Sequence, residues 1–511
     1  MRLRTRLIAA GMGIVCFGVL AARLAFLQLI DSGWYAAKAA DQQLRDSVIP
    51  AARGKIYSAD GTLLADSVTC WTIRAEPRAL ADELVEPASR ALAEILELEY
   101  EEVLEKLSQR TSNDALLKYR VDKETADAVR DWAAANQAEG ILILQDTRRV
   151  YPEGDFLGSV LGFTNVDNAG MAGIELEYNQ DLTGINGRVL TAKNAWGYAM
   201  PQDYDVAVQP VEGNSLVLTI DAHIQHYLEK SLEAAVEEHN VGARAVGIVM
   251  DVNTGAVLGM STTPDFDPNQ PRIITDEETR AEVDSLTGEE RSAALQQAQQ
   301  YQWRNKAISD LYEPGSVFKL ITASAALDSG AVTPQDTYYC GKSYNVAGTQ
   351  FHCANHKTHG LQNLETALQN SCNQSFIQIG QRLGKENFTA YFEAFGLREG
   401  TGIDLPGEIK RSEYYTADRM GPVELASCSF GQSSKISYLQ MITAVCAVVN
   451  GGKLMQPYLV QEIRDVNGNV LKEVEPTVKN QVLKPETSET ICQMMEAVVL
   501  EGGGKNAYVD G

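Results

Sequence analysis

A serine and a lysine three residues apart offer the clearest chemistry in this sequence. Ser316 and Lys319 lie in the segment EPGSVFK, residues 313–319, and an apolar run follows. Proline and glycine end the preceding element, so we expect a helix to begin at or near Ser316. Positions i and i+3 share a helix face, which brings the lysine amine beside the hydroxyl. A buried lysine has a lowered pKa and can deprotonate a serine, so the pair indicates a nucleophile and its base.

A second polar triplet makes this pattern more specific. By composition alone, a Ser-x-x-Lys match is expected about once or twice in a chain of this size, and its plain interpretation is an ordinary helix start. Ser371-Cys372-Asn373 also precedes an apolar helical run. Penicillin-interacting enzymes combine an S-x-x-K motif with an S-x-N element and a K-T-G strand. Two of these three elements are present, and no Lys-Thr-Gly triplet follows Ser371.

Composition limits the class of protein. A chain of 511 residues predicts two or three domains, and apolar and charged shares of 44% and 22% are typical of globular proteins. The net charge of -24 excludes nucleic acid as a partner, because phosphate backbones bind to basic surfaces.

The first thirty residues predict a membrane anchor. Three arginines within residues 1–6 precede an apolar run, Leu7 to Ile30, interrupted by Arg23 and Gln28. About 20 apolar residues cross a bilayer, and basic residues stay on the cytoplasmic side. We therefore expect one spanning helix, with the bulk of the chain outside the cell membrane. A cleaved signal peptide is the alternative, but the apolar sequence continues past its candidate cleavage site.

Turn signals and apolar periodicity predict an α+β protein. Asp60-Gly61 between apolar runs indicates a hairpin, and residues 80–137 show helical spacing. Residues 151–197 are rich in glycine and predict loops and short strands. After a composition change near Pro210, residues 216–221 predict a strand, a helix begins near Ala222, and a second hairpin turns at residues 253–255.

Together these motifs resemble the class B penicillin-binding proteins over nearly the whole chain. The resemblance implies a transmembrane helix (1–30), a β-rich pedestal or dimerisation domain (31–209), and a transpeptidase domain (210–511) with an antiparallel sheet flanked by helices. It rests on Arg53-Gly54, Leu161-Gly162-Phe163, Gly173-Ile174-Glu175, Leu218-Thr219-Ile220-Asp221, Thr254-Gly255, Arg304-Asn305, residues 313–319 and Gly431-Gln432. Because the Lys-Thr-Gly triplet is missing, we expect the transpeptidase domain to be incomplete at its C-terminal end.

The resemblance also implies a reaction. Ser316 would attack the penultimate D-Ala carbonyl of a peptidoglycan stem peptide ending in D-Ala-D-Ala, release the terminal D-Ala and form an acyl-enzyme, which an amine of a neighbouring strand resolves. Lys319 would be the base, Ser371 would relay a proton, and Asn373 would hold the substrate amide. Gly431 and Gln432 would bind substrate, although Ser433 follows where the family more often has glycine.

The same resemblance implies partners and alternatives. β-Lactams would acylate the nucleophile, no cofactor is needed, and a polytopic glycosyltransferase would supply the glycan strand in division or sporulation. A β-lactam sensor or serine β-lactamase of the same fold is one alternative, and a non-catalytic scaffold is another.

Cysteine and histidine gather between the two catalytic motifs. Residues 352–359 read HCANHKTH, and zinc ligation by Cys340, Cys353, His356 and His359 has suitable donor types. We expect no metal, because the spacing fits no standard zinc pattern. An ordinary polar loop is one alternative. The other is a disulfide from Cys353 to Cys372 or Cys340, because thiols outside the membrane can oxidise. A Cys353–Cys372 redox pair would make activity redox-sensitive, a trait associated with some sporulation members of the family.

Overall fold

A computed structural model describes residues 11–12, 15, 17–20, 23, 26, 44–192, 206–242 and 244–509. Most of the predicted membrane-spanning segment, residues 7–30, lies outside these ranges. Among the helices that are described, none is long and apolar enough to cross a bilayer. The chain forms two compact units. The first consists of residues 1–52, 69–147 and 184–212, and the second of residues 53–68, 148–183 and 213–511. The units interleave along the sequence, and the domain ranges 31–209 and 210–511 stay a prediction.

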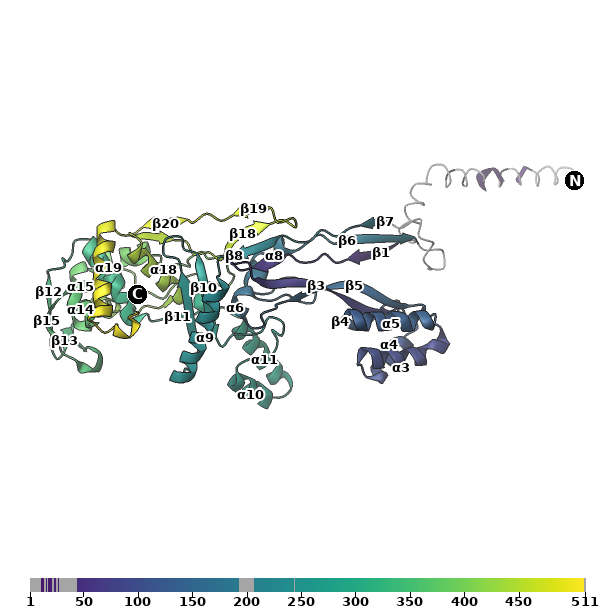
Figure 1. The fold of residues 1–511 in the computed structure, drawn as a ribbon, viewed down its shortest axis with the longest axis horizontal. Coiled ribbons are helices and arrows are strands. Elements are labelled where there is room, and N and C mark those ends of the chain that lie inside the picture. The colour runs from purple at the N-terminus through teal and green to yellow at the C-terminus, as the bar shows by residue number, and fades with distance from the viewer. Residues whose placement is uncertain are drawn as a thin grey trace, which may run out of the picture. The chain divides into compact units, whose positions relative to one another are not determined.

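Helices pack on strands in the first unit (Figure 1). Its helices are α3 (Val85–Leu96), α4 (Tyr100–Ser108) and α5 (Lys123–Ala135). Strand β3 (Leu63–Ala75) belongs to this unit from residue 69 onward, and it pairs with β4 (Ala115–Val121) and β5 (Ile141–Val150). Ile73, Leu92, Val103, Leu117 and Val129 form the core between them. The predicted helices over residues 80–137 are thus present, but β4 interrupts them, and its buried side chains Leu117 and Val121 join the core that the helices form.

A separate three-stranded antiparallel sheet also belongs to the first unit. Its order is β1 (Leu44–Ile49), β6 (Gly187–Ala192) and β7 (Val206–Val208).

The sheet of the second unit is mixed rather than antiparallel. The predicted Asp60-Gly61 hairpin is confirmed, because β2 (Ile56–Tyr57) pairs antiparallel with β3 and Gly61 has a φ of 89°. β8 (Ser215–Leu218) pairs antiparallel with β18 (Val460–Arg464), which continues to β19 (Val470–Glu473). β2 and β8, however, run parallel. The antiparallel pairing expected within residues 210–511 is present in β8, β18 and β19 and in the hairpin of residues 245–263, whereas the parallel pair involves β2, which lies outside that range and is joined to β8 by a long crossover.

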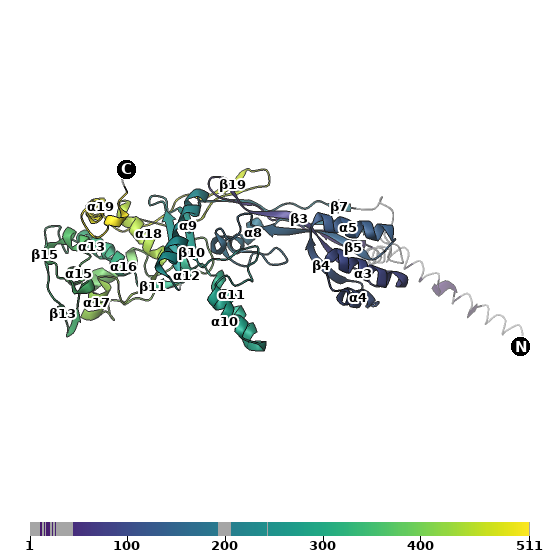
Figure 2. The same ribbon diagram turned by 60° about the horizontal axis from the view of Figure 1, so that its bottom comes forward.

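The predicted strand, helix and hairpin after residue 215 are confirmed. The Asp221 carboxylate caps α9 (Ala222–His239) by accepting from the N–H groups of His223 and Ile224. The helix lies against the hairpin of β9 (Ala245–Met250) and β10 (Val257–Thr263). The polar stretch that follows forms two helices, α10 (Glu277–Ser285) and α11 (Gly288–Trp303), which lie side by side (Figure 2).

A helical core supports the candidate site. α13 (Lys319–Asp328) packs against α15 (Asn373–Leu383), α18 (Tyr438–Val449) and α19 (Pro485–Leu500), and α17 (Pro422–Cys428) packs on α15. Phe318, Ile321, Phe376, Ile377 and Ala444 are among its buried side chains. The remaining elements of the second unit are α6 (Gly158–Leu161), α7 (Gly173–Glu177), α8 (Asn179–Leu182), α12 (Lys306–Ser309), α14 (Leu364–Gln369), α16 (Lys385–Ala394), β11 (Leu311–Tyr312), β12 (Thr337–Cys340), β13 (Tyr344–Val346), β14 (Thr349–Phe351), β15 (Gly360–Asn363), β16 (Ile436–Ser437), β17 (Lys453–Met455) and β20 (Val478–Gln481).

A buried ion cluster joins two segments that carried the family resemblance. The Glu175 carboxylate, which has no exposed surface, accepts from Arg53 Nε at 2.5 Å and from Arg149 Nε at 2.6 Å. Arg149 also donates to the Gly54 carbonyl at 2.7 Å. Removing one member would leave a buried charge uncompensated. The cluster therefore holds the loop that precedes β2 against α7.

Candidate active site

Ser316 and Lys319 lie at the start of the central helix of the second unit. One 3₁₀ turn, Gly315–Phe318, leads directly into α13. Ser316 is exposed, whereas the Lys319 side chain is 1% exposed and its Nζ lies 3.0 Å from Ser316 Oγ. The i, i+3 spacing therefore brings the two groups together as expected, with the hydroxyl at the surface and the amine beneath it.

Lys319 Nζ is surrounded by oxygen atoms. Besides the Ser316 hydroxyl, it lies 2.8 Å from the Ser371 carbonyl, 2.8 Å from Ser371 Oγ and 2.8 Å from Asn373 Oδ1. Ser371 Oγ donates to Ser316 Oγ at 3.0 Å, so the two hydroxyls and the amine are in mutual contact. An ammonium has three N–H donors for these four oxygens, whereas a neutral amine offers a lone pair to a hydroxyl proton. Burial lowers the pKa of Lys319 to about 8, which favours the neutral amine.

The turn between α14 and α15 presents Ser371 and Asn373 to this amine. The Ser371 N–H donates to the Leu368 carbonyl and the Cys372 N–H donates to the Ala367 carbonyl, both at 2.9 Å. These two bonds form a Schellman motif, which needs a left-handed residue, and Ser371 supplies it with a φ of 49°. Such a conformation costs about 1–3 kcal/mol for a residue other than glycine, and it places the serine hydroxyl over Lys319.

Gly431 approaches the nucleophile from a second loop. Its carbonyl accepts the Gly315 N–H at 2.9 Å, and its φ is 88°. A Cβ at this position would lie 1.9 Å from the Gly315 carbonyl oxygen, so only glycine fits. Gln432 is exposed on the same loop, and the Ser433 N–H donates to the Glu313 carboxylate at 2.9 Å.

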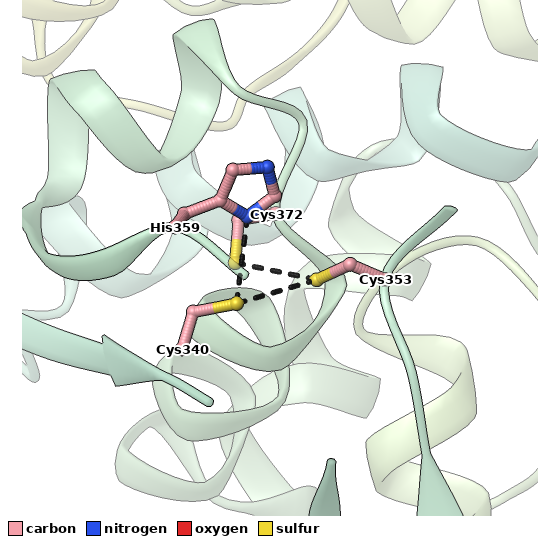
Figure 3. Close-up of side chains that lie close together, drawn as sticks. All are labelled: Cys340, Cys353, His359 and Cys372. Carbon is pink, nitrogen blue, oxygen red and sulfur yellow. Dashed lines mark hydrogen bonds between the residues drawn. The ribbon is translucent and has the colours of Figure 1, made fainter. Parts of the chain in front are cut away.

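Three cysteines and one histidine form a second group beside the active-site turn (Figure 3). We call Cys340, Cys353, His359 and Cys372 the cysteine cluster, because their ligand atoms all lie within 4.8 Å of one another. His356, the other histidine that the sequence offered as a zinc ligand, is instead exposed, with its ring 4.8 Å from that of His352.

The same geometry bears on the predicted redox pair. The Sγ atoms of Cys353 and Cys372 are 3.6 Å apart, well beyond the length of a disulfide bond, and each described cysteine is free. The redox pair therefore stays a prediction. The sequence paired Cys353 with Cys372 or Cys340, but it did not reveal that all three cysteines gather with His359, because the turn that brings Cys372 there is a tertiary feature.

Two family models match the chain. The Penicillin binding protein transpeptidase domain matches residues 245–511, and the Penicillin-binding Protein dimerisation domain matches residues 48–218.

Curated relatives and solved structures agree with these matches. Stage V sporulation protein D of Bacillus subtilis is 33% identical over 98% of this chain and 73% of its own length. Peptidoglycan D,D-transpeptidase FtsI of Escherichia coli is 26% identical over 96% of this chain and 76% of its own length. The crystal structure of Penicillin Binding Protein 2X from Streptococcus thermophilus shares the fold with a TM-score of 0.69 at 19% identity, covering 88% of this chain and 66% of that chain. With its serine and lysine motifs in contact and both domain models matched, the chain belongs to the class B penicillin-binding proteins, which carry a dimerisation domain and a transpeptidase domain.

Proposed function

We propose that this chain cross-links peptidoglycan stem peptides as a serine-type D,D-transpeptidase with Ser316 as its nucleophile. The observation that carries the proposal is the contact of Ser316, Lys319 and Ser371 through hydrogen bonds of 2.8–3.0 Å. A nucleophile within hydrogen-bond reach of a base, itself oriented by a third group, is the arrangement that acyl transfer requires.

Acylation would begin when neutral Lys319 takes the Ser316 hydroxyl proton. The oxygen then bonds to the carbonyl carbon of the penultimate D-Ala, and the bond from that carbon to the terminal D-Ala nitrogen breaks. Ser371 Oγ lies within hydrogen-bond distance of both Lys319 Nζ and Ser316 Oγ. It would pass the proton from Lys319 to the nitrogen of the departing D-Ala, which then leaves with a neutral amino group. The acceptor amine of a second stem peptide would attack the ester, return a proton to Ser316 and complete the cross-link.

Asn373 would orient the base as well as bind substrate. Its Oδ1 accepts from Lys319 at 2.8 Å, and its Nδ2 donates to the His352 carbonyl at 3.1 Å. Holding a substrate amide would therefore require one of these bonds to be exchanged. Gly431 and Gln432, on the loop that contacts Gly315, would line the substrate side of the site.

The predicted anchor in residues 7–30 would place this reaction outside the cell membrane, where stem peptides and β-lactams are accessible. A polytopic glycosyltransferase would supply glycan strands. β-Lactams would acylate Ser316 because they resemble the D-Ala-D-Ala terminus.

Covalent labelling by a fluorescent penicillin tests the proposal, using protein expressed from the complete coding sequence. We expect labelling that is lost in Ser316→Ala and kept in Ser329→Ala, an exposed serine at the end of the same helix. A stem pentapeptide with an added amine acceptor should yield cross-linked product and free D-Ala. A folded protein that takes no label would support the non-catalytic scaffold. Rapid release of hydrolysed penicillin would support a β-lactamase.

A further inference from the structure

The cysteine cluster has the dimensions of a tetrahedral metal site. Cys353 Sγ lies 3.6 Å from both Cys340 Sγ and Cys372 Sγ, and Cys340 Sγ lies 3.4 Å from His359 Nδ1. Zinc bonds of about 2.3 Å to sulfur and about 2.0–2.1 Å to nitrogen give tetrahedral edges of about 3.8 Å between sulfurs and about 3.5 Å between sulfur and nitrogen. These three separations agree with the tetrahedral edges to within about 0.2 Å, and all four ligand atoms lie within 4.8 Å of one another. Figure 3 shows the four side chains gathered at one place.

The ligands come from three places in the chain: the end of β12, the connection from β14 to β15, and the turn before α15. Cys340 ends β12 and pairs in register with Gly360 of β15, so His359 directly precedes the residue opposite Cys340. Cys353 follows β14, and Cys372 caps α15. Cys340 and Cys372 lie at the end of a strand and the start of a helix, Cys353 precedes a 3₁₀ turn (Ala354–His356), and His359 precedes β15, so regular structure adjoins every ligand and the site is preformed.

Burial and hydrogen bonding favour a metal over unligated thiols. The exposed fractions of Cys340, Cys353 and Cys372 are 1%, 5% and 0%. Cys372 Sγ accepts from the Ser375 N–H at 3.5 Å and from Ser375 Oγ at 3.2 Å, as a metal-bound thiolate does. Three thiolates and one imidazole in a closed, water-poor site are a standard set for structural zinc, and soft thiolates disfavour calcium and magnesium.

We propose that Cys340, Cys353, His359 and Cys372 bind one structural zinc ion. This site goes beyond the proposed transpeptidase function and replaces the expectation that the segment holds no metal. The sequence pattern offered His356 in place of Cys372, which hid a complete ligand set.

Zinc at this point would stabilise the active-site turn. Cys372 lies between Ser371 and Asn373, which both contact Lys319. Cys353 directly follows His352, whose carbonyl accepts the Asn373 amide. Ligation of the two cysteines would therefore fix the backbone on both sides of the Asn373 side chain. This consequence, unlike the metal site itself, rests on the proposed function.

Metal content is the primary test, and it needs no catalysis. The full chain, purified under reducing conditions without chelator, should contain about one zinc per molecule by mass spectrometry. His359→Ala and Cys340→Ser should lose the metal, and His359→Cys, which keeps four ligands, should retain it. His356→Ala and Cys492→Ser are matched controls outside the cluster and should bind zinc normally. Circular dichroism on each variant separates loss of metal from loss of fold.

Cobalt substitution covers the case in which ligand variants fail to fold. Unaltered protein stripped of zinc and loaded with Co²⁺ should show the intense visible absorption of tetrahedral thiolate coordination. Folded protein that holds no zinc and gives no such spectrum would overturn the proposal. A zinc-free protein could instead show a Cys353–Cys372 disulfide in a peptide map made without reduction. That result would favour the redox pair over the metal site, because the disulfide uses two of the four ligands. Loss of zinc in His356→Ala would refute the assigned ligands.

Failure of the metal site and failure of the proposed function give different results. Penicillin labelling of a zinc-free protein would leave the transpeptidase proposal standing, and zinc bound to an unlabelled protein would leave the metal site standing.

Discussion

We expect the rate at which a penicillin acylates Ser316 to rise with pH and to level off above about pH 8. Burial lowers the pKa of Lys319 to about 8 from its usual 10.5. At pH 7, about 9% of the protein would then carry the neutral amine, compared with about 0.03% for an unperturbed lysine. The neutral form is the base, so activity increases as the proton is lost. Between pH 6 and pH 9 the neutral fraction rises from about 1% to about 90%, which predicts a rate increase of roughly ninety-fold.

The assay is the second-order acylation rate of a fluorescent penicillin, measured by quenched labelling across this pH range. Lys319→Met should lose the rising limb and slow acylation by about 10²–10⁴-fold. Lys453→Met, a change at an exposed lysine, should keep the profile. Tryptophan fluorescence at each pH checks that the protein remains folded. A flat profile, or an unchanged rising limb in Lys319→Met, would refute Lys319 as the base. A rate that still rises about tenfold per pH unit up to pH 9 would contradict the lowered pKa of Lys319.

Substitutions at three further positions test the geometry around the nucleophile and the fold. Ser371→Gly and Ser371→Ala should both slow acylation, but Gly should be more stable by about 1 kcal/mol in urea unfolding because it accepts the positive φ; equal stabilities would contradict backbone strain. Gly431→Ala should reduce labelling at least tenfold because its Cβ overlaps the Gly315 carbonyl, and a normally labelled, folded variant would contradict that contact. Glu175→Gln should lower the free energy of unfolding by about 3–5 kcal/mol because two buried arginines lose their counter-charge. The surface Lys106–Glu102 pair, with side chains 31% and 53% exposed, is its control, where a single substitution should change stability by less than about 1 kcal/mol.

Local sequence patterns predicted the features that depend on residues close together in the sequence. They did not predict the features that depend on residues far apart in the sequence. The contact between Ser316 and Lys319 follows from helix geometry alone. By contrast, the parallel pairing of β2 and β8 joins residues 160 positions apart, and no local pattern encodes it. The histidines show the same limit. Asn355 and His356 have φ values of 54° and 52°, and His356 is exposed, whereas strand pairing brings His359 beside Cys340.

The turn Ser371-Cys372-Asn373 has different environments at its successive side chains. Its first and third side chains contact Lys319, and its middle side chain lies in the cysteine cluster. Ser371 holds a left-handed conformation that costs free energy, and such a conformation persists only where its surroundings fix it. The Schellman bonds supply part of that constraint, and a zinc ion bound to the next residue would supply more. The middle position of this motif would then set the geometry of the catalytic groups through the backbone, without contacting substrate.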